Sequence, residues 1–333
     1  MIHGDNGEGK TNLLEAVGWV ATVESFRGAP AEALVRSGAE SAVVRATGTR
    51  DDREVLIEGE ISPRGRTRVL VNHQPLRRAR DLLGALRVTV FNPDDLVMVK
   101  GGPAERRRYL DDLLVACHPR WDALRSEVER ILRQRAVLLK QAGGRLTADI
   151  STTLDVWDEK LSSAGTALAD GRADLVGRLQ PTVATAYASM AGKGDPVALA
   201  YWAPWREAGL AAALAAARTD DLRRGVSTVG PHRDDLVISL NGLPARTHAS
   251  QGEQRSLALA LRLGGHDVVR EDAGDEPVLL LDDVFSELDP SRSAALLTHL
   301  PAGQALLTTA GPLPDGVTPA AILEVRAGTV AAL

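Results

Sequence analysis

The first residues of the chain include a glycine-rich segment whose residue types could bind phosphate. Residues 4–11 are Gly-Asp-Asn-Gly-Glu-Gly-Lys-Thr and fit the pattern G-x-x-x-x-G-K-[ST]. In such a loop, backbone N–H groups converge on a phosphate, and the following helix adds about half a positive charge at its N-terminus. We expect Lys10 to reach the β- and γ-phosphate oxygens and Thr11 to bind Mg²⁺. The residues assigned to nucleotide binding are Gly4, Asp5, Asn6, Gly7, Glu8, Gly9, Lys10, Thr11 and Asn12.

A pair of carboxylates follows an apolar run in the C-terminal part of the chain. Residues 278–281 are Val-Leu-Leu-Leu, which is typical of a buried strand, and Asp282 and Asp283 come directly after it. We expect Asp282 to hold Mg²⁺, directly or through water, and Asp283 to polarise the attacking water. Lys10 and Asp283 are therefore the expected catalytic residues. An Asp at the end of a strand can also merely cap a turn, but the phosphate loop favours a Walker B strand.

A third motif decides between classes of phosphate-loop proteins. Residues 250–255, Ser-Gln-Gly-Glu-Gln-Arg, open a helical pattern and resemble the signature loop of the ABC/SMC ATPases. In that superfamily the signature faces the nucleotide of a second copy, so that two heads enclose two ATP molecules. Ser250 and Glu253 also fit a helix-capping pair, and both interpretations can hold at once. The residues concerned are Ser250, Gln251, Gly252 and Glu253, followed after the Walker B strand by a D-loop of Ser286, Glu287, Leu288 and Asp289.

Apolar spacing predicts that these motifs belong to two halves of one α/β head. The glycine-rich loop continues into a helix, and "DDLVISLNGLPAR" predicts a hairpin around Asn241-Gly242. The expected strands lie within 41–61, 68–76, 86–91, 234–246, 276–290 and 304–310.

The middle of the chain is helical instead. Apolar residues recur at helical spacing from Ala104 to Gly143, with a break at Pro119, and a second stripe runs from Leu154 to Leu179. Two such helices with a short connection predict an antiparallel helical arm, the first of about 20 residues and roughly 30 Å long. The expected domains are 1–100 and 226–333, the two halves of an ABC/SMC-type head, and 101–225, the inserted helical lobe.

Composition places limits on the protein class. The 333 residues are 44% hydrophobic and 25% charged, which is ordinary for a globular protein. A single cysteine, Cys117, excludes an internal disulfide and a cysteine-based zinc site. No apolar run approaches the ~18 residues of a membrane span, and the N-terminus does not resemble a signal peptide. We therefore expect a cytoplasmic protein with no membrane partner.

The net charge of −5 conceals a basic region. Between residues 61 and 108, Lys and Arg outnumber Asp and Glu, which favours contact with phosphates. An exposed helix start explains the run at 106–108 equally well. The candidate DNA-binding residues are Arg64, Arg66, Arg68, Arg106, Arg107 and Arg108.

Six segments together carry a closer resemblance over essentially the whole chain. They are "GDNGEGKTNLLEA", "FNPDDL", "GGPAERRRYLD", "GPHRDDL", "SQGEQRSLALALRL" and "LLLDDVFSELD". In this order and spacing they resemble the RecF family of bacterial DNA-repair ATPases. The resemblance implies an ATP- and Mg²⁺-dependent homodimer that binds single-stranded, gapped or junction DNA. It further implies cooperation with other recombination mediators to load recombinase, in support of replication, gap repair and SOS induction, with slow ATP hydrolysis as a switch.

One departure and several alternatives remain. Family members begin with strands before the glycine-rich loop, whereas only Met1, Ile2 and His3 precede it here. We expect a start site placed too late or a truncated sequence, in which Gly4 lacks an anchoring strand and ATP binding is impaired. A DNA-binding protein with an inactive nucleotide site is thus one alternative. An SMC or double-strand-break ATPase head would need far longer arms. A transporter subunit would carry a switch histidine, where this chain has Thr308-Thr309-Ala310.

Overall fold

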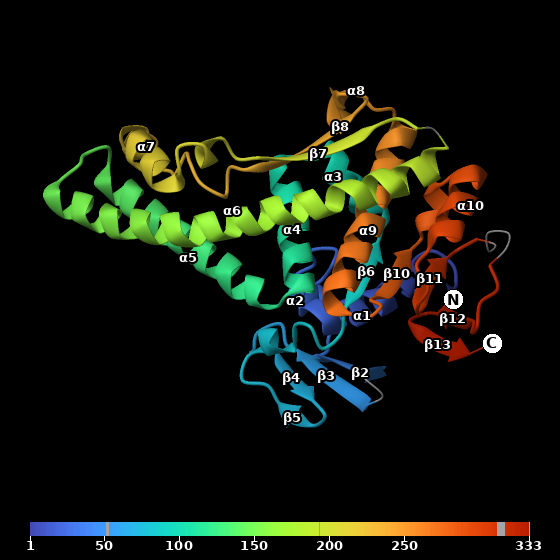
Figure 1. Ribbon diagram of the computed structural model, residues 1–333. Coiled ribbons are helices and arrows are strands. Elements are labelled where there is room, and N and C mark those ends of the chain that lie inside the picture. Colours follow the sequence, from blue (N-terminus) through green and yellow to red (C-terminus); the bar gives the residue numbers. More distant parts are fainter. Residues whose placement is uncertain (51–52, 193, 312–316, 333) are drawn as a thin grey trace. The chain divides into compact units, whose positions relative to one another are not determined.

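The computed structural model describes residues 1–50, 53–192, 194–311 and 317–332 (Figure 1). The chain forms two compact units, one of Met1–Asp94 with Ala273–Leu333 and one of Asp95–Asp272. The second unit therefore extends well past the expected boundary at residue 225. It includes the predicted hairpin and the signature helix, both of which we had placed in the C-terminal half of the head.

A six-stranded sheet forms the centre of the first unit. Its order is β13-β12-β1-β11-β10-β6, and all neighbours pair in parallel except β12 with β13. Leu279, Leu280 and Leu281 of β10 are at most 1% exposed, as expected for a strand covered on both faces. The strands are β1 (Ile2–His3), β6 (Val88–Phe91), β10 (Val278–Asp282), β11 (Ala305–Thr309), β12 (Leu323–Arg326) and β13 (Thr329–Ala332).

The short strand β1 corrects one expectation. Ile2 and His3 pair with Thr308 and Thr309 of β11 on one side and with β12 on the other. Ile2 is 1% exposed and packs with Leu14 and Leu280 in the core of this unit. Strand β1 thus lies between β11 and β12, and Gly4 follows directly from a paired strand.

A smaller antiparallel sheet completes the first unit. Its order is β2-β3-β4-β5, and Trp19 of α1 packs against its Ile57, Ile61 and Val69. A Cβ atom on Gly59 would lie 2.1 Å from the Trp19 ring, so this close packing requires glycine. The elements are α1 (Lys10–Thr22), α2 (Ala31–Leu34), β2 (Ala42–Arg50), β3 (Arg53–Ile61), β4 (Arg68–Val71), β5 (Gln74–Pro75), η1 (Ala79–Leu82), η4 (Val284–Glu287) and α10 (Pro290–His299).

The second unit contains the predicted antiparallel arm. Helices α5 (Arg120–Ala142) and α6 (Ala148–Ala191) lie side by side (Figure 1), joined through Gly143 in the left-handed conformation. At 44 residues, α6 is longer than its apolar stripe indicated and contains Pro181. Among the described residues, no helix is long and apolar enough to cross a membrane. The remaining helices of this unit are α3 (Val97–Lys100), α4 (Pro103–Cys117), η3 (Pro204–Arg206), α7 (Leu210–Arg224) and α8 (Ala245–His248), with α9 (Gln251–Ala273) up to its last residue, and η2 (Pro93–Leu96) crosses the boundary between the units.

The predicted hairpin belongs to a three-stranded sheet of the second unit. Strands β8 (Asp235–Leu240) and β9 (Leu243–Pro244) form the hairpin, and β7 (Val197–Trp202) pairs antiparallel with β8. Strand β7 is not among the strands predicted from the sequence. Leu236, Ile238 and Leu240 alternate inward and join the core of this unit.

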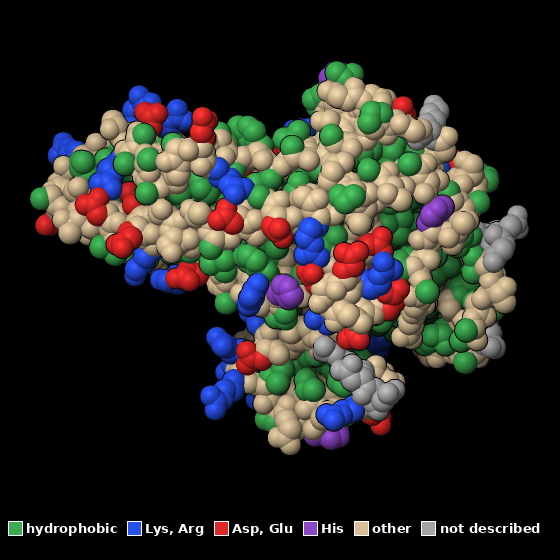
Figure 2. All heavy atoms as spheres, viewed as in Figure 1, with side chains coloured by type: hydrophobic (Ala, Val, Ile, Leu, Met, Phe, Trp, Pro, Cys, Tyr) green, Lys and Arg blue, Asp and Glu red, His purple; other side chains and the backbone are tan. Residues whose placement is uncertain are grey.

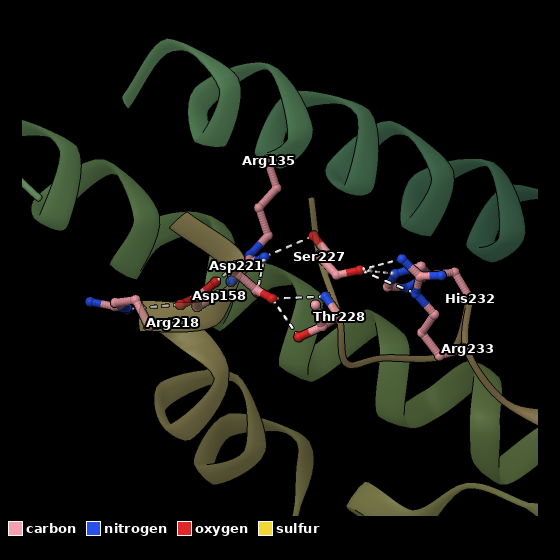
Figure 3. A network of polar contacts seen from close by, with 8 residues as sticks. All are labelled: Arg135, Asp158, Arg218, Asp221, Ser227, Thr228, His232 and Arg233. Atoms are coloured by element: carbon pink, nitrogen blue, oxygen red, sulfur yellow. Dashed lines mark hydrogen bonds and ion pairs between the residues drawn. The ribbon is translucent and has the colours of Figure 1, made fainter. Parts of the chain in front are cut away.

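A buried arginine of α5 forms ion pairs with the neighbouring helices α6 and α7 (Figure 3). Arg135, which interrupts the apolar stripe of α5, is fully buried, and its Nε lies 2.7 Å from Asp158 Oδ1 of α6. Its Nη1 donates to Asp221 Oδ2 of α7 and to Ser227 Oγ, both at 2.7 Å. The carboxylate of Asp221 also accepts hydrogen bonds from the backbone and hydroxyl of Thr228. One guanidinium thus connects three helices and the loop that follows them.

The "GPHRDDL" segment continues this network into the rest of the second unit. Asp234 is fully buried and accepts hydrogen bonds from the Tyr201 hydroxyl and from Trp205 Nε1. His232 Nε2 lies 3.0 Å from the Ser227 carbonyl, which can only accept, so this nitrogen carries the proton. Burial lowers the pKa of His232 to about 4, which keeps the ring neutral at pH 7. The contacts described for this motif connect elements within the second unit, which indicates a structural role for the motif.

We predict that Arg135→Met lowers the free energy of unfolding by about 3–5 kcal/mol, because the carboxylates of Asp158 and Asp221 lose their buried counter-charge. Urea denaturation followed by circular dichroism measures the change. Arg145→Met, at an exposed position in the loop between α5 and α6, is the control and should stay within about 0.5 kcal/mol of the wild type. Equal stability of the two variants would show that the buried pairs contribute nothing net.

Candidate functional site

The glycine-rich loop connects β1 to α1 and has the backbone of a phosphate loop. Gly7 has φ 86° and Gly9 has φ 106°, in the left-handed region that favours glycine. A Cβ atom on Gly4 would lie 2.4 Å from the Val325 carbonyl oxygen of β12, so the first glycine is required by close approach. Gly9 directly precedes α1, whose N-terminal N–H groups are available to an anion.

The side chain of Lys10 hydrogen-bonds back to the backbone of this loop. Its side chain is 7% exposed, and Nζ donates to the carbonyl oxygens of Gly4 at 2.7 Å and Asp5 at 2.8 Å. An ammonium group has three N–H donors, so one remains for a ligand oxygen. The position fits the predicted contact of Lys10 with a phosphate.

The two predicted metal ligands lie in contact with each other. Thr11 Oγ1, in the first turn of α1, donates to Asp282 Oδ1 at the end of β10 at 2.9 Å. Thr308 Oγ1, on β11, donates to the same oxygen at 2.8 Å. The hydroxyl and the carboxylate are oxygen ligands of the kind that Mg²⁺ prefers. Among the described residues, no cluster of three or more His, Cys, Asp or Glu side chains offers a rival metal site.

Asp283 has an unusual backbone conformation. Its φ of 48° and ψ of 28° are left-handed, which is uncommon for a residue other than glycine and occurs frequently at functional sites. Its backbone N–H donates to Thr308 Oγ1 at 2.9 Å. Within the described part of the chain, nothing hydrogen-bonds or ion-pairs with its half-buried carboxylate. That carboxylate can therefore accept a proton, as the Walker B interpretation requires.

Glu8 makes contacts with the C-terminal hairpin that were not predicted from the sequence. Its carbonyl oxygen accepts from the backbone N–H of Gly328 at 3.0 Å, and its carboxylate accepts from that of Ala327. Both donors lie in the left-handed turn between β12 and β13. The Glu8 side chain thus braces the phosphate loop against the C-terminal hairpin. No local pattern in the sequence connects residue 8 with residues 327–328.

The signature residues adopt the expected capping arrangement. The backbone N–H and the hydroxyl of Ser250 both donate to Glu253 Oε2 at 2.7 Å, and the Glu253 N–H donates back to Ser250 Oγ at 3.4 Å. This capping box opens α9, on which Gln251 and Gly252 occupy the first turn. Contact with a second copy stays a prediction.

The D-loop residues lie between β10 and α10. Ser286 Oγ donates to the Asp283 carbonyl oxygen at 2.8 Å, and Asp289 caps α10 by accepting from the Arg292 N–H at 2.9 Å. The Ser291 hydroxyl and this N–H lower the pKa of Asp289 to about 2. Leu288 is partly buried, and the side chain of Glu287 lies outside the described set.

The predicted DNA-binding arginines separate into two groups. Arg106 is 6% exposed, and its guanidinium binds both oxygens of Asp235 and the Gly101 carbonyl oxygen. It therefore holds α4 to β8, and the structure contradicts its assignment to DNA. Arg107 is partly buried and donates to the Asp234 carbonyl oxygen, which limits its reach. Arg64, Arg66, Arg68 and Arg108 are exposed, and the first three lie on or beside the small antiparallel sheet. Figure 2 shows Lys and Arg side chains on the surface of this part of the first unit, low in the view.

Comparisons with known proteins give a consistent answer. Residues 1–307 match the model of the RecF/RecN/SMC N terminal domain. The DNA replication and repair protein RecF of Streptomyces avermitilis is 46% identical over 98% of this chain and 91% of its own length. RecF of Frankia alni is 48% identical over 92% of this chain and 86% of its own length.

Solved structures agree with these relatives. The recombination mediator protein RecF with ATP, of the RecFOR pathway, has a TM-score of 0.91 at 30% identity and covers all of this chain and 90% of its own. An Smc head domain from Pyrococcus furiosus has a TM-score of 0.55 at 15% identity, with coverage of 100% and 88%, which reflects the fold alone. The predicted α/β head with a helical insertion is thereby confirmed. The chain belongs to the RecF family of RecF/RecN/SMC proteins.

Proposed function

We propose that this chain is an ATP-dependent DNA-binding protein of recombinational DNA repair. Its curated relatives are named DNA replication and repair proteins, and a structure at 30% identity is a recombination mediator with ATP bound. The observation that carries the proposal is the contact of Thr11 with Asp282, because it joins the two halves of a nucleotide site from opposite ends of the chain.

The residues present fit ATP and Mg²⁺. Gly4, Asp5, Asn6, Gly7, Glu8 and Gly9 would surround the phosphates, with Lys10, Thr11 and Asn12 at the start of α1. Thr11 and Asp282 would hold Mg²⁺, which neutralises phosphate charge when bound. Asp283 would orient a water molecule and accept its proton. The paired strand β1 supports a working site over the alternative of an inactive one.

Two copies would share each nucleotide. In this proposal Ser250, Gln251, Gly252 and Glu253 of one copy, with the D-loop residues 286–289, contact the triphosphate held by the other. The dimer would bind single-stranded or gapped DNA at junctions through Arg64, Arg66, Arg68 and Arg108. It would assist other recombination mediators in loading recombinase, and so support replication and SOS induction. Slow hydrolysis would release the DNA.

We predict that Asp283→Asn leaves ATP affinity within about threefold of wild type but lowers kcat by about 10²- to 10⁴-fold, because the amide cannot accept the proton. Calorimetric ATP titration and single-turnover hydrolysis separate the two quantities. Asp170→Asn, which alters an exposed carboxylate of α6 that pairs with Arg206 and lies outside the proposed nucleotide site, is the control. Normal hydrolysis by Asp283→Asn would remove Asp283 from the mechanism.

A second variant tests the shared nucleotide and the function itself. We predict that Ser250→Ala weakens Mg·ATP-driven dimerisation by about tenfold or more, while ATP affinity of the monomer is unchanged, because the lost hydroxyl serves the other copy's nucleotide. Light scattering with and without gapped DNA measures dimerisation, and DNA should strengthen it in the wild type.

The matched control is Thr147→Ala. Thr147 caps α6 as Ser250 caps α9, so both variants should lose about 1 kcal/mol of stability. Only Ser250→Ala should lose dimerisation. Equal loss in both variants, or a wild-type chain that stays monomeric with Mg·ATP and gapped DNA, would contradict the proposal.

A further inference from the structure

The hydroxyl group of Thr308 forms hydrogen bonds with two neighbouring residues, Asp282 and Asp283. Its Oγ1 donates its proton to Asp282 Oδ1 at 2.8 Å and accepts the backbone N–H of Asp283 at 2.9 Å. The residue lies on β11 directly opposite Asp282 of β10, and it is 1% exposed. Water therefore has little access to replace either hydrogen bond. No pattern in the sequence had given Thr308 a role.

We propose that Thr308 is a positioning residue for ATP hydrolysis, which couples the side chain of Asp282 to the backbone of Asp283. This inference rests on the proposed ATPase function and names the residue that aligns its two carboxylates. Thr308 acts only through these acids and would touch neither ATP nor Mg²⁺.

The first half of the coupling concerns Asp282. Its Oδ1 accepts from both Thr11 and Thr308, and these two donors fix the plane and rotamer of the carboxylate. Among the described residues, nothing donates to Oδ2 of Asp282. The two hydroxyls therefore occupy one oxygen and leave the other available for a cation. Without Thr308, only Thr11 would orient the carboxylate.

The second half concerns Asp283. A left-handed backbone costs free energy in a residue with a Cβ atom, so it persists only where surrounding contacts hold it. The hydrogen bond from the Asp283 N–H to Thr308 Oγ1 is such a contact, and the orientation of this peptide determines the direction of the Asp283 side chain. The oxygen of this hydroxyl group accepts the Asp283 N–H, and its proton is donated to Asp282. Movement of either aspartate therefore disturbs the hydrogen bond of the other.

Three variants test this coupling. Thr308→Val removes the hydroxyl at nearly constant volume, and Thr308→Ser keeps it. Thr309→Val is the matched control, because the hydroxyl of Thr309, the next residue on the same strand, bonds to Gly311 instead. Thermal denaturation establishes that all three variants are folded.

The first readout needs no nucleotide. Hydrogen exchange of the Asp283 amide should be about tenfold faster in Thr308→Val, since its acceptor is lost, and unchanged in Thr308→Ser and Thr309→Val. Unchanged exchange in Thr308→Val would overturn the proposal. Because this readout is independent of ATP, it decides on the link to Asp283 even if the wild-type chain hydrolyses no ATP and the proposed function fails.

The second readout separates positioning from binding. Thr308→Val should lower kcat by about 10- to 100-fold with KM for ATP within about threefold, and should require more Mg²⁺ for half-maximal hydrolysis, whereas Thr308→Ser should restore kcat. A loss of kcat that Thr308→Ser does not restore would indicate a packing role and overturn the proposal. An unchanged kcat in Thr308→Val would overturn it as well.

Discussion

The proposed nucleotide site depends on one carboxylate oxygen. Asp282 Oδ1 accepts hydrogen bonds from Thr11 on α1 and from Thr308 on β11. These contacts join the start of the chain to two strands near its end. Asp282 and Thr308 are almost fully buried, and Thr11 is partly buried. Each hydrogen bond is worth about 1 kcal/mol, but breaking one while its partner remains buried costs more. The arrangement of the site is therefore maintained chiefly by the cost of leaving these groups unpaired.

The geometry of the parallel sheet explains why these few hydrogen bonds are enough to position the residues of the site. Parallel strands end at the same edge, so Asp282 and Thr308 lie opposite each other in the β10–β11 register, and Ile2 of β1 pairs with Thr308 from the other side. The phosphate loop follows β1 directly and therefore begins at this edge of the sheet. The Glu8 carboxylate also connects this loop to the turn between β12 and β13, where it accepts the N–H of Ala327. In the second unit, the corresponding organising contact is Arg135 with its two aspartates.

The features that the sequence predicted correctly are those with short-range patterns. The glycine-rich loop, the apolar run before Asp282 and the Ser250–Glu253 capping pair are each contained within a few residues. The features that it missed depend on contacts between distant segments. Arg106 resembled a phosphate ligand because its partner Asp235 is far away in the chain, and the apolar stripe of α5 gave no reason for Arg135 until Asp158 and Asp221 were in place. Strand β7 was missed for the same reason, because its partner β8 comes only after α7 in the chain.

The most direct test of this account is the position of a metal ion in crystals of the full chain grown with ATP and Mn²⁺. Mn²⁺ can replace Mg²⁺ at oxygen sites, and its anomalous scattering distinguishes it from the protein atoms and from water. The account predicts one strong anomalous peak per chain, between the Thr11 hydroxyl and Asp282, with Thr308 still bonded to Asp282 Oδ1. A peak bound by other residues, or an Asp282 carboxylate turned away from both threonines, would contradict it.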